Sequence, residues 1–198
     1  MKIAVMGSHP ATKMQAPFDD PEWKIWACSP HNFRDPSWHT IFNGVWVWPD
    51  MYIIRTPPNF PQGALPRVDE WFEVHPQAKH KSRDKDYLEF VRQLSEKIPV
   101  WMQDLSDHPN ARKYPTEEVI EEFGPFMLTS SIAYILAKAI MAKPEAIGLW
   151  GVMQATTTEK EDQLPGIKYF LSEANRRGIK VCLPEQAAHI FKLPEDKW

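Results

Sequence analysis

Short apolar runs alternate with longer amphipathic segments along this chain, and most of the runs end at Gly, Ser or Pro. Residues 2–6 stop at Gly7, and residues 146–150 stop in the same way at Gly151. Short apolar runs bounded by turn residues are typical of buried strands. They predict strands at residues 2–6, 23–28, 44–54, 69–75, 99–103, 146–150 and 179–183. Pro49 interrupts the third run, which is therefore expected at a sheet edge.

The amphipathic segments have apolar residues at the spacing of one helix face. The clearest one begins after Thr129-Ser130-Ser131 and is closed by Lys143-Pro144. Another ends at Arg176-Arg177-Gly178, where cations and a residue that adopts left-handed backbone are both favoured. Asp84 and Thr116 are suited to cap two further helices, and Pro184 to open the last one. Helices are predicted near residues 84–94, 116–124, 131–143, 167–177 and 184–191.

This order of elements predicts the fold class. Strands that alternate with helices form parallel sheets through right-handed crossovers. We expect an α/β protein, a Rossmann-like three-layer sandwich with a mostly parallel sheet and helices on both faces. A length of 198 residues suits one domain, residues 1–198. The prolines and tryptophans gather in a predicted insert at about residues 30–68.

Composition excludes several classes of function. A formal charge of −3 and a pI near 6.2 make nucleic acid an unlikely partner, because backbone binding needs clustered Lys and Arg. No apolar run approaches the 18 residues of a membrane span, and no signal peptide begins the chain, so a cytoplasmic protein without membrane contact is expected. Cys28 and Cys182 follow strand-like runs and are predicted to be reduced core thiols.

Ligands of open parallel sheets bind beyond the carboxyl ends of the strands, so the loops there supply the candidate site. Ser130 and Ser131 join these loops, because a helix N-terminus offers free N–H groups to an anion such as phosphate. The candidate ligand-binding residues are Gly7, Ser8, His9, Ser29, Ser130, Ser131, Gly151, Gln154 and Gln163. His75 and Glu159 are the candidate acid–base residues.

Each candidate also has a purely structural interpretation. Gly7-Ser8 suits a tight turn, and Ser130 suits a helix cap that needs no ligand. His75 can simply end a strand, and Glu159 can lie in a solvated loop or a first helical turn. His9 and His31 have no third ligand, so no metal is required. The tryptophans, Trp71 and Trp101 among them, favour core packing, with stacking on a base as the alternative.

Familiar catalytic and phosphate motifs are missing from the chain. The first turn, GSHPATK, has neither the GxGxxG dinucleotide pattern nor the GxxxxGK[ST] phosphate loop. HExxH, CxxC and GxSxG do not occur either. The sequence therefore does not support an ordinary dehydrogenase, a P-loop kinase, a zinc peptidase, a redox dithiol protein or an α/β-hydrolase.

The segments TSSIAYILAKAI, KPEAIGLWGV and GIKYFLSEANRRGIKVCLPEQAAHIF resemble the C-terminal half of bacterial sialyltransferases that use a cytidine-monophosphate sugar donor. MGSHPATK and WKIWACSPHNF resemble the first two strand-loop units of that family, which hold the nucleotide. In general layout, WFEVH and the pattern of Glu159, Gln163, Pro165 and Gly166 resemble uncharacterised phage-encoded Rossmann-like proteins. The resemblance implies nucleotide contacts at Gly7, Ser8, Ser29, Ser130 and Gly151.

Two departures separate the chain from the sialyltransferase pattern. Met153 stands where the family has Asp after Gly-Ile, and residues 155–166 (ATTTEKEDQLPG) contain no histidine where the family has its catalytic one. The chemistry of the family is therefore not carried over. The leading hypothesis is a protein that binds a nucleotide or a nucleotide sugar, including a glycosyltransferase-like transferase. A non-catalytic phage protein that sequesters a nucleotide and a protein-interaction module stay open, as does a homo-oligomer.

Overall fold

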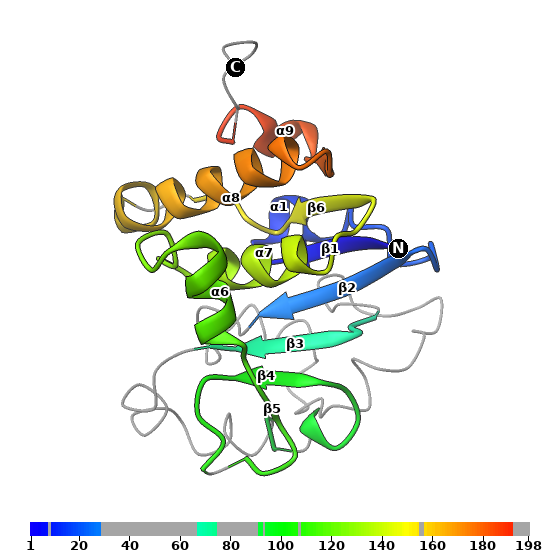
Figure 1. Cartoon of the computed structure of the whole chain (residues 1–198). Coiled ribbons are helices and arrows are strands. Elements are labelled where there is room, and N and C mark those ends of the chain that lie inside the picture. Colours follow the sequence, from blue (N-terminus) through cyan, green and yellow to red (C-terminus); the bar gives the residue numbers. More distant parts are fainter. Residues whose placement is uncertain are drawn as a thin grey trace.

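The strands form one fully parallel sheet in a computed structural model that describes residues 1–7, 9–28, 67–74, 91–92, 94–106, 108–154 and 157–191. Seven strands in these residues lie in the order β5-β4-β3-β2-β1-β6-β7 (Figure 1). They are β1 (Lys2–Met6), β2 (Trp23–Cys28), β3 (Glu70–Glu73), β4 (Val100–Met102), β5 (Arg112–Lys113), β6 (Ala146–Trp150) and β7 (Lys180–Cys182). The expected α/β class with a parallel sheet is confirmed.

Helices cover the sheet, and in the described residues they lie between β1 and β2, before β4, between β5 and β6, between β6 and β7, and after β7. They are α1 (Pro10–Lys13), α6 (Thr116–Phe123), α7 (Ser131–Met141), the π-helix η1 (Glu159–Gln163), α8 (Leu164–Arg176) and α9 (Glu185–Ala188). η1 leads directly into α8. Residues 91–92 and 94–95 are also helical and belong to the helix expected at 84–94.

Strand β1 lies in the interior of the sheet, between β2 and β6, and is buried on both faces. Ala4 pairs with Ile25 of β2 on one side and with Gly148 of β6 on the other. Ile3 and Val5 face one hydrophobic cluster, and Ala4 and Met6 face another. A strand covered on both faces must be apolar throughout rather than alternating, which is why the run after Lys2 is continuous.

Helices α7 and α8 cover one face of the sheet (Figure 1). Their apolar stripes include Ile135, Leu136 and Ile140 from α7 and Ile167 and Phe170 from α8, all fully buried. Each such side chain contributes about 1.5–3 kcal/mol by leaving water. The opposite face packs against residues that follow α1, including Phe18, and against Leu94.

Helix α8 ends as its sequence predicts. Gly178 has a φ of 76°, and the N–H of Ile179 donates to the carbonyl of Ala174 at 3.0 Å. A left-handed residue followed by this six-to-one hydrogen bond is a Schellman motif. The helix stops there, so that Ile179 turns into the core ahead of β7.

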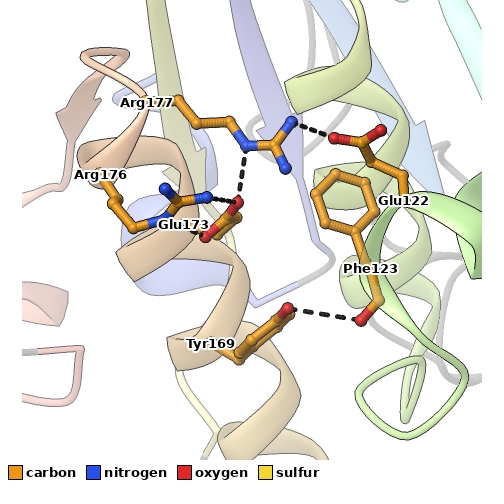
Figure 2. Close-up of polar contacts among 6 residues, drawn as sticks. All are labelled: Glu122, Phe123, Tyr169, Glu173, Arg176 and Arg177. Carbon is orange, nitrogen blue, oxygen red and sulfur yellow. Dashed lines mark hydrogen bonds and ion pairs between the residues drawn. The ribbon is translucent and has the colours of Figure 1, made fainter.

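Arg177 joins α8 to α6 (Figure 2). Its guanidinium forms ion pairs with Glu173 at 2.6 Å and with Glu122 of α6 at 2.7 Å, and lies 4.8 Å from the centre of the Phe123 ring. Arg176 donates two hydrogen bonds to the Glu173 carboxylate, at 2.6 and 2.8 Å. The hydrogen bonds from Arg176 and then Arg177 lower the pKa of Glu173 to about 2. The cluster holds the C-terminal ends of α6 and α8 together.

Several details differ from the sequence-based predictions. Strand β5 was not expected, because Arg112 and Lys113 are exposed edge residues without an apolar run. Thr116 does not cap α6: it is the first helical residue, after Pro115, and no side chain caps this helix. Helix α9 ends at Ala188 and does not extend to Phe191. The strand expected at 44–54 and most of the insert expected at 30–68 lie outside the described residues.

Candidate functional site

The direction of the crossovers reverses beside β1. The sheet continues from β1 through β2, β3, β4 and β5 on one side, whereas β6 and β7 lie on the other. The loops after β1 and β6 therefore leave the same edge of the sheet and diverge. Ligands of open α/β sheets bind in the crevice at such a switch point. Gly7, His9 and residues 151–154 occupy this position.

Two glycines bring these loops into backbone contact. The N–H of Gly7 donates to the carbonyl of Trp150 at 2.8 Å, and the N–H of His9 donates to the carbonyl of Gly151 at 2.8 Å. A Cβ atom on Gly7 would lie 2.3 Å from the Gly151 oxygen, and one on Gly151 would lie 2.4 Å from the Gly7 oxygen. Only glycine allows this approach, so the two loops meet through main chain alone at these positions.

Two residues of α1 complete this contact, and sequence analysis did not single them out. The buried Thr12 hydroxyl accepts a hydrogen bond from the N–H of Gly151 at 2.8 Å. Lys13 is 4% exposed, and its Cβ would lie 3.0 Å from a Cβ on Gly151. Burial lowers the pKa of Lys13. The available signal was a threonine and a lysine in the segment GSHPATK, shortly after the first strand.

His9 has a structural role in addition to its place in the crevice. It is the N-cap of α1, and its Nδ1 accepts from the N–H of Ala11 at 3.3 Å. The ring nitrogen that bonds to Ala11 carries no proton there, so Nε2 is the protonated nitrogen of the neutral ring. The structure thus brings Gly7, His9 and Gly151 together, as the sequence predicted.

Gln154 lies three residues beyond Gly151 in an unusual conformation. Its φ is 47°, and Lys143 is the one other described non-glycine residue with a positive φ. The Gln154 side chain is 5% exposed, and its Oε1 atom is buried without a hydrogen-bond partner. A buried amide oxygen without a donor is costly, and left-handed backbone at a non-glycine residue is strained.

Ser130 and Ser131 begin helix α7 at the same edge of the sheet. The N–H of Glu145, between α7 and β6, donates to the carbonyl of Met1, so α7 ends beside the amino ends of the strands. An 11-residue helix spans about 16 Å, as does a five-residue strand. The helix therefore begins at the carboxyl edge. Ser130 is its N-cap, with Oγ accepting from the N–H of Ala133 at 3.2 Å.

The start of α8 lies against the loop that precedes α7. Thr129 Oγ1 donates to the carbonyl of Gln163 at 3.3 Å. A Cβ on Gly166 would lie 2.4 Å from both the Met127 oxygen and Thr129 Oγ1. Gly166 thus permits η1 and α8 to approach the serines, and π-helical turns occur frequently at functional sites.

The candidate acid–base residues are placed only in part. Glu159 is a half-buried residue at the start of η1, and it has an interaction partner in the structure. Gln163 ends η1 and is half-buried. Ser8, Ser29 and His75 lie outside the described residues.

The end of β3 adds a buried carboxylate that sequence analysis did not single out. Glu73 is 0% exposed. Burial, and then the negative charge of Glu73, raise the pKa of Cys28 to about 12. At this pKa Cys28 is a neutral thiol near neutral pH, and it donates a hydrogen bond to the Met6 carbonyl at 3.5 Å. Both cysteines are free, as expected.

The described tryptophans pack in the protein. Trp71 is 1% exposed, and Lys138 of α7 places Nζ 3.9 Å from the centre of the Trp101 ring. Trp101 also donates to Glu70 at 2.5 Å. Base stacking at these two residues is thereby disfavoured. Within the described part of the chain, no three His, Cys, Asp or Glu side chains are grouped to hold a metal ion, and no helix is long and apolar enough to cross a bilayer.

Comparisons with known proteins give one structural likeness to report. No protein-family model matches the chain, and no curated protein matches it in sequence. The fold is similar to that of the sialyltransferase CstII from Campylobacter jejuni in complex with a substrate analogue, cytidine-5′-monophosphate. The TM-score is 0.53 at 11% identity, over 97% of this chain and 84% of that chain. At this identity the likeness establishes a shared fold, so the resemblance to sialyltransferases is confirmed at the level of architecture.

Proposed function

We propose that this chain binds a nucleotide or a nucleotide sugar in the crevice between β1 and β6. The contact between Gly7 and Gly151 at the switch point is the observation that carries the proposal, because it lines the crevice with main chain and lets a flat nucleoside approach closely. The nucleotide phosphate would bind at Ser130 and Ser131, where α7 offers N–H groups and the positive end of its dipole.

The comparison supports a specific class of ligand. The similar sialyltransferase structure holds cytidine-5′-monophosphate, and its fold spans nearly the whole of this chain. Cytidine monophosphate and sugars activated by it are therefore the first ligands to test. With such a donor the chain would be a glycosyltransferase-like transferase. Ser8 and Ser29 would complete the nucleoside site, and His75 and Glu159 are the residues that we propose for proton transfer.

Calorimetric titration and thermal unfolding with nucleoside monophosphates test the proposal. A ligand present at one hundred times its dissociation constant stabilises the folded state by about 2.7 kcal/mol, which raises Tm by several degrees. We expect this for cytidine monophosphate. If millimolar concentrations of every common nucleotide and of CMP-sialic acid leave Tm unchanged, the proposal is refuted.

Substitutions at the start of α7 separate ligand contact from helix capping. Ser130→Ala removes the cap and should cost about 1 kcal/mol of stability whether or not a nucleotide binds. Ser131→Ala leaves the cap intact and should weaken nucleotide binding several-fold at nearly constant Tm. Ser172→Ala, on α8, is the matched control and should change neither quantity. An unchanged affinity in Ser131→Ala would place the phosphate elsewhere.

Non-catalytic binding is the second candidate, and it also rests on particular residues. Met153 stands at the position of an expected aspartate, and residues 155–166 have no histidine. A phage-type protein that sequesters a nucleotide would need neither. Incubation with CMP-sialic acid distinguishes the two: release of cytidine monophosphate above the spontaneous rate indicates a transferase or hydrolase, and tight binding without release indicates sequestration.

A further inference from the structure

Gln154 combines two unfavourable features at one position. Left-handed backbone is unfavourable for a residue other than glycine, and Gln154 adopts it with a φ of 47°. Its buried Oε1 atom has no hydrogen-bond donor among the residues that the structure describes. Such features persist where the surrounding structure imposes them, and they gather at ligand clamps.

Gln154 lies close in the chain to the switch point between β1 and β6. Gly151, three residues earlier, is fixed by its hydrogen bonds with His9 and Thr12. The segment that leads to Gln154 therefore begins at a fixed point of the backbone. Val152 is buried, which keeps the segment against the sheet. A supported backbone therefore holds Gln154 close to the switch point, with its amide oxygen buried. An acceptor of this kind needs a donor that the protein does not supply.

We propose that Gln154 Oε1 accepts a hydrogen bond from the nucleoside part of the bound nucleotide, and that this contact makes Gln154 a specificity-determining residue. The inference rests on the proposed function. The candidate donors are the exocyclic amine of the base and the 2′-hydroxyl of the ribose. Both satisfy the same acceptor, and ligand variants separate them. Uridine monophosphate replaces the amine by a carbonyl, and 2′-deoxycytidine monophosphate removes one hydroxyl.

Titration calorimetry of Gln154→Met with these three nucleotides tests the assignment. Methionine keeps the length of the side chain and removes the acceptor. We expect about tenfold weaker binding of cytidine monophosphate, the loss that one hydrogen bond typically gives. Tm should not fall, because the substitution removes a buried polar atom that has no partner in the free protein. Gln186→Met, at an exposed position on α9, is the matched control and should bind as the wild type does.

The ligand variants identify the donor. If the base amine donates, wild type binds uridine monophosphate weakly and Gln154→Met does not weaken it further. If the ribose hydroxyl donates, the same holds for the 2′-deoxy nucleotide. Gln154→Asn, which tolerates left-handed backbone better, is a second variant in case the methionine disturbs folding, and it should show the same loss of affinity.

Three results would overturn the inference. Wild-type affinity of both Gln154 variants for all three nucleotides would show that the acceptor meets no ligand, while the proposed function would stand. An equal loss for all three nucleotides would show that neither the base amine nor the 2′-hydroxyl donates to Gln154. Failure of the wild type to bind any nucleotide would remove the inference and the proposed function together.

Discussion

Substitution of Gly151 by alanine is expected to be one of the most damaging small changes in the described structure. The new Cβ would lie 2.4 Å from the Gly7 oxygen and 3.0 Å from Lys13 Cβ, and the backbone would keep a φ of 67°. The left-handed conformation costs alanine about 1 kcal/mol. Relief of the overlap costs about 1–3 kcal/mol, and disturbance of the hydrogen bonds to Trp150 and Gly151 about 1 kcal/mol more.

Two other glycines separate these contributions. Gly178 also has a positive φ, of 76°, but nothing lies within 4 Å of its would-be Cβ. Gly178→Ala should therefore cost only the conformational part, about 1 kcal/mol. At Gly7 the overlap is present, whereas a left-handed backbone is not. The expected order of destabilisation is Gly178→Ala, then Gly7→Ala, then Gly151→Ala at about 3–5 kcal/mol.

Urea unfolding followed by tryptophan fluorescence measures this order, with stabilities taken from linear extrapolation. Since domains are typically stable by about 5–15 kcal/mol, the largest change should move the midpoint strongly or unfold the protein. If Gly151→Ala is no more destabilising than Gly178→Ala, the two loops do not touch as described, and the argument for a crevice lined by main chain fails.

Three further predictions concern other parts of the described structure. Glu173→Gln should make the free energy of unfolding depend less on pH in the acid range. The lowered pKa of Glu173 contributes stability that is present above the ordinary pKa near 4.5 and is lost as pH falls toward 2. This contribution is about 1–2 kcal/mol, because solvent screens the exposed arginines. Urea titrations of wild type and variant between pH 6 and about 2 should converge at the acid end; parallel curves would refute this. Gly166→Ala should push against Met127 and Thr129, lower Tm by several degrees and weaken nucleotide binding; unchanged binding would separate η1 from the site. Lys143→Gly, at an exposed left-handed position after α7, should raise stability by up to about 1 kcal/mol in the same urea assay; a loss would show that the lysine side chain matters more than its backbone.

The central part of the fold could be predicted from sequence because its signals are local. β1, β2 and β6 have the predicted limits, since runs that are apolar apart from Lys2 and Lys24 and that are followed by Gly or Ser mark mostly buried strands. The end of α8 at Gly178 is equally local. β5 consists of two exposed basic residues that form a strand only by pairing with β4, so no hydrophobic periodicity in the sequence predicts it.

In the candidate site, too, the features with local sequence signals could be predicted and those that depend on tertiary packing could not. Gly7 and Gly151 were predicted from the rule on strand ends, and their contact follows from the pairing of β1 with β6. The burial of Thr12, Lys13 and Glu73 depends on how α1 and β3 pack in three dimensions, and polar residue types alone do not predict it. The left-handed backbone of Gln154 is imposed by its surroundings and has no signature in the sequence.

A crystal structure of the chain with cytidine monophosphate tests the central claim most directly. The account predicts the nucleoside over Gly7 and Gly151 at the β1–β6 switch point, with the phosphate at the N–H groups of Ser130 and Ser131. A nucleotide bound on another surface, or bound in the crevice with its phosphate away from the start of α7, would contradict it.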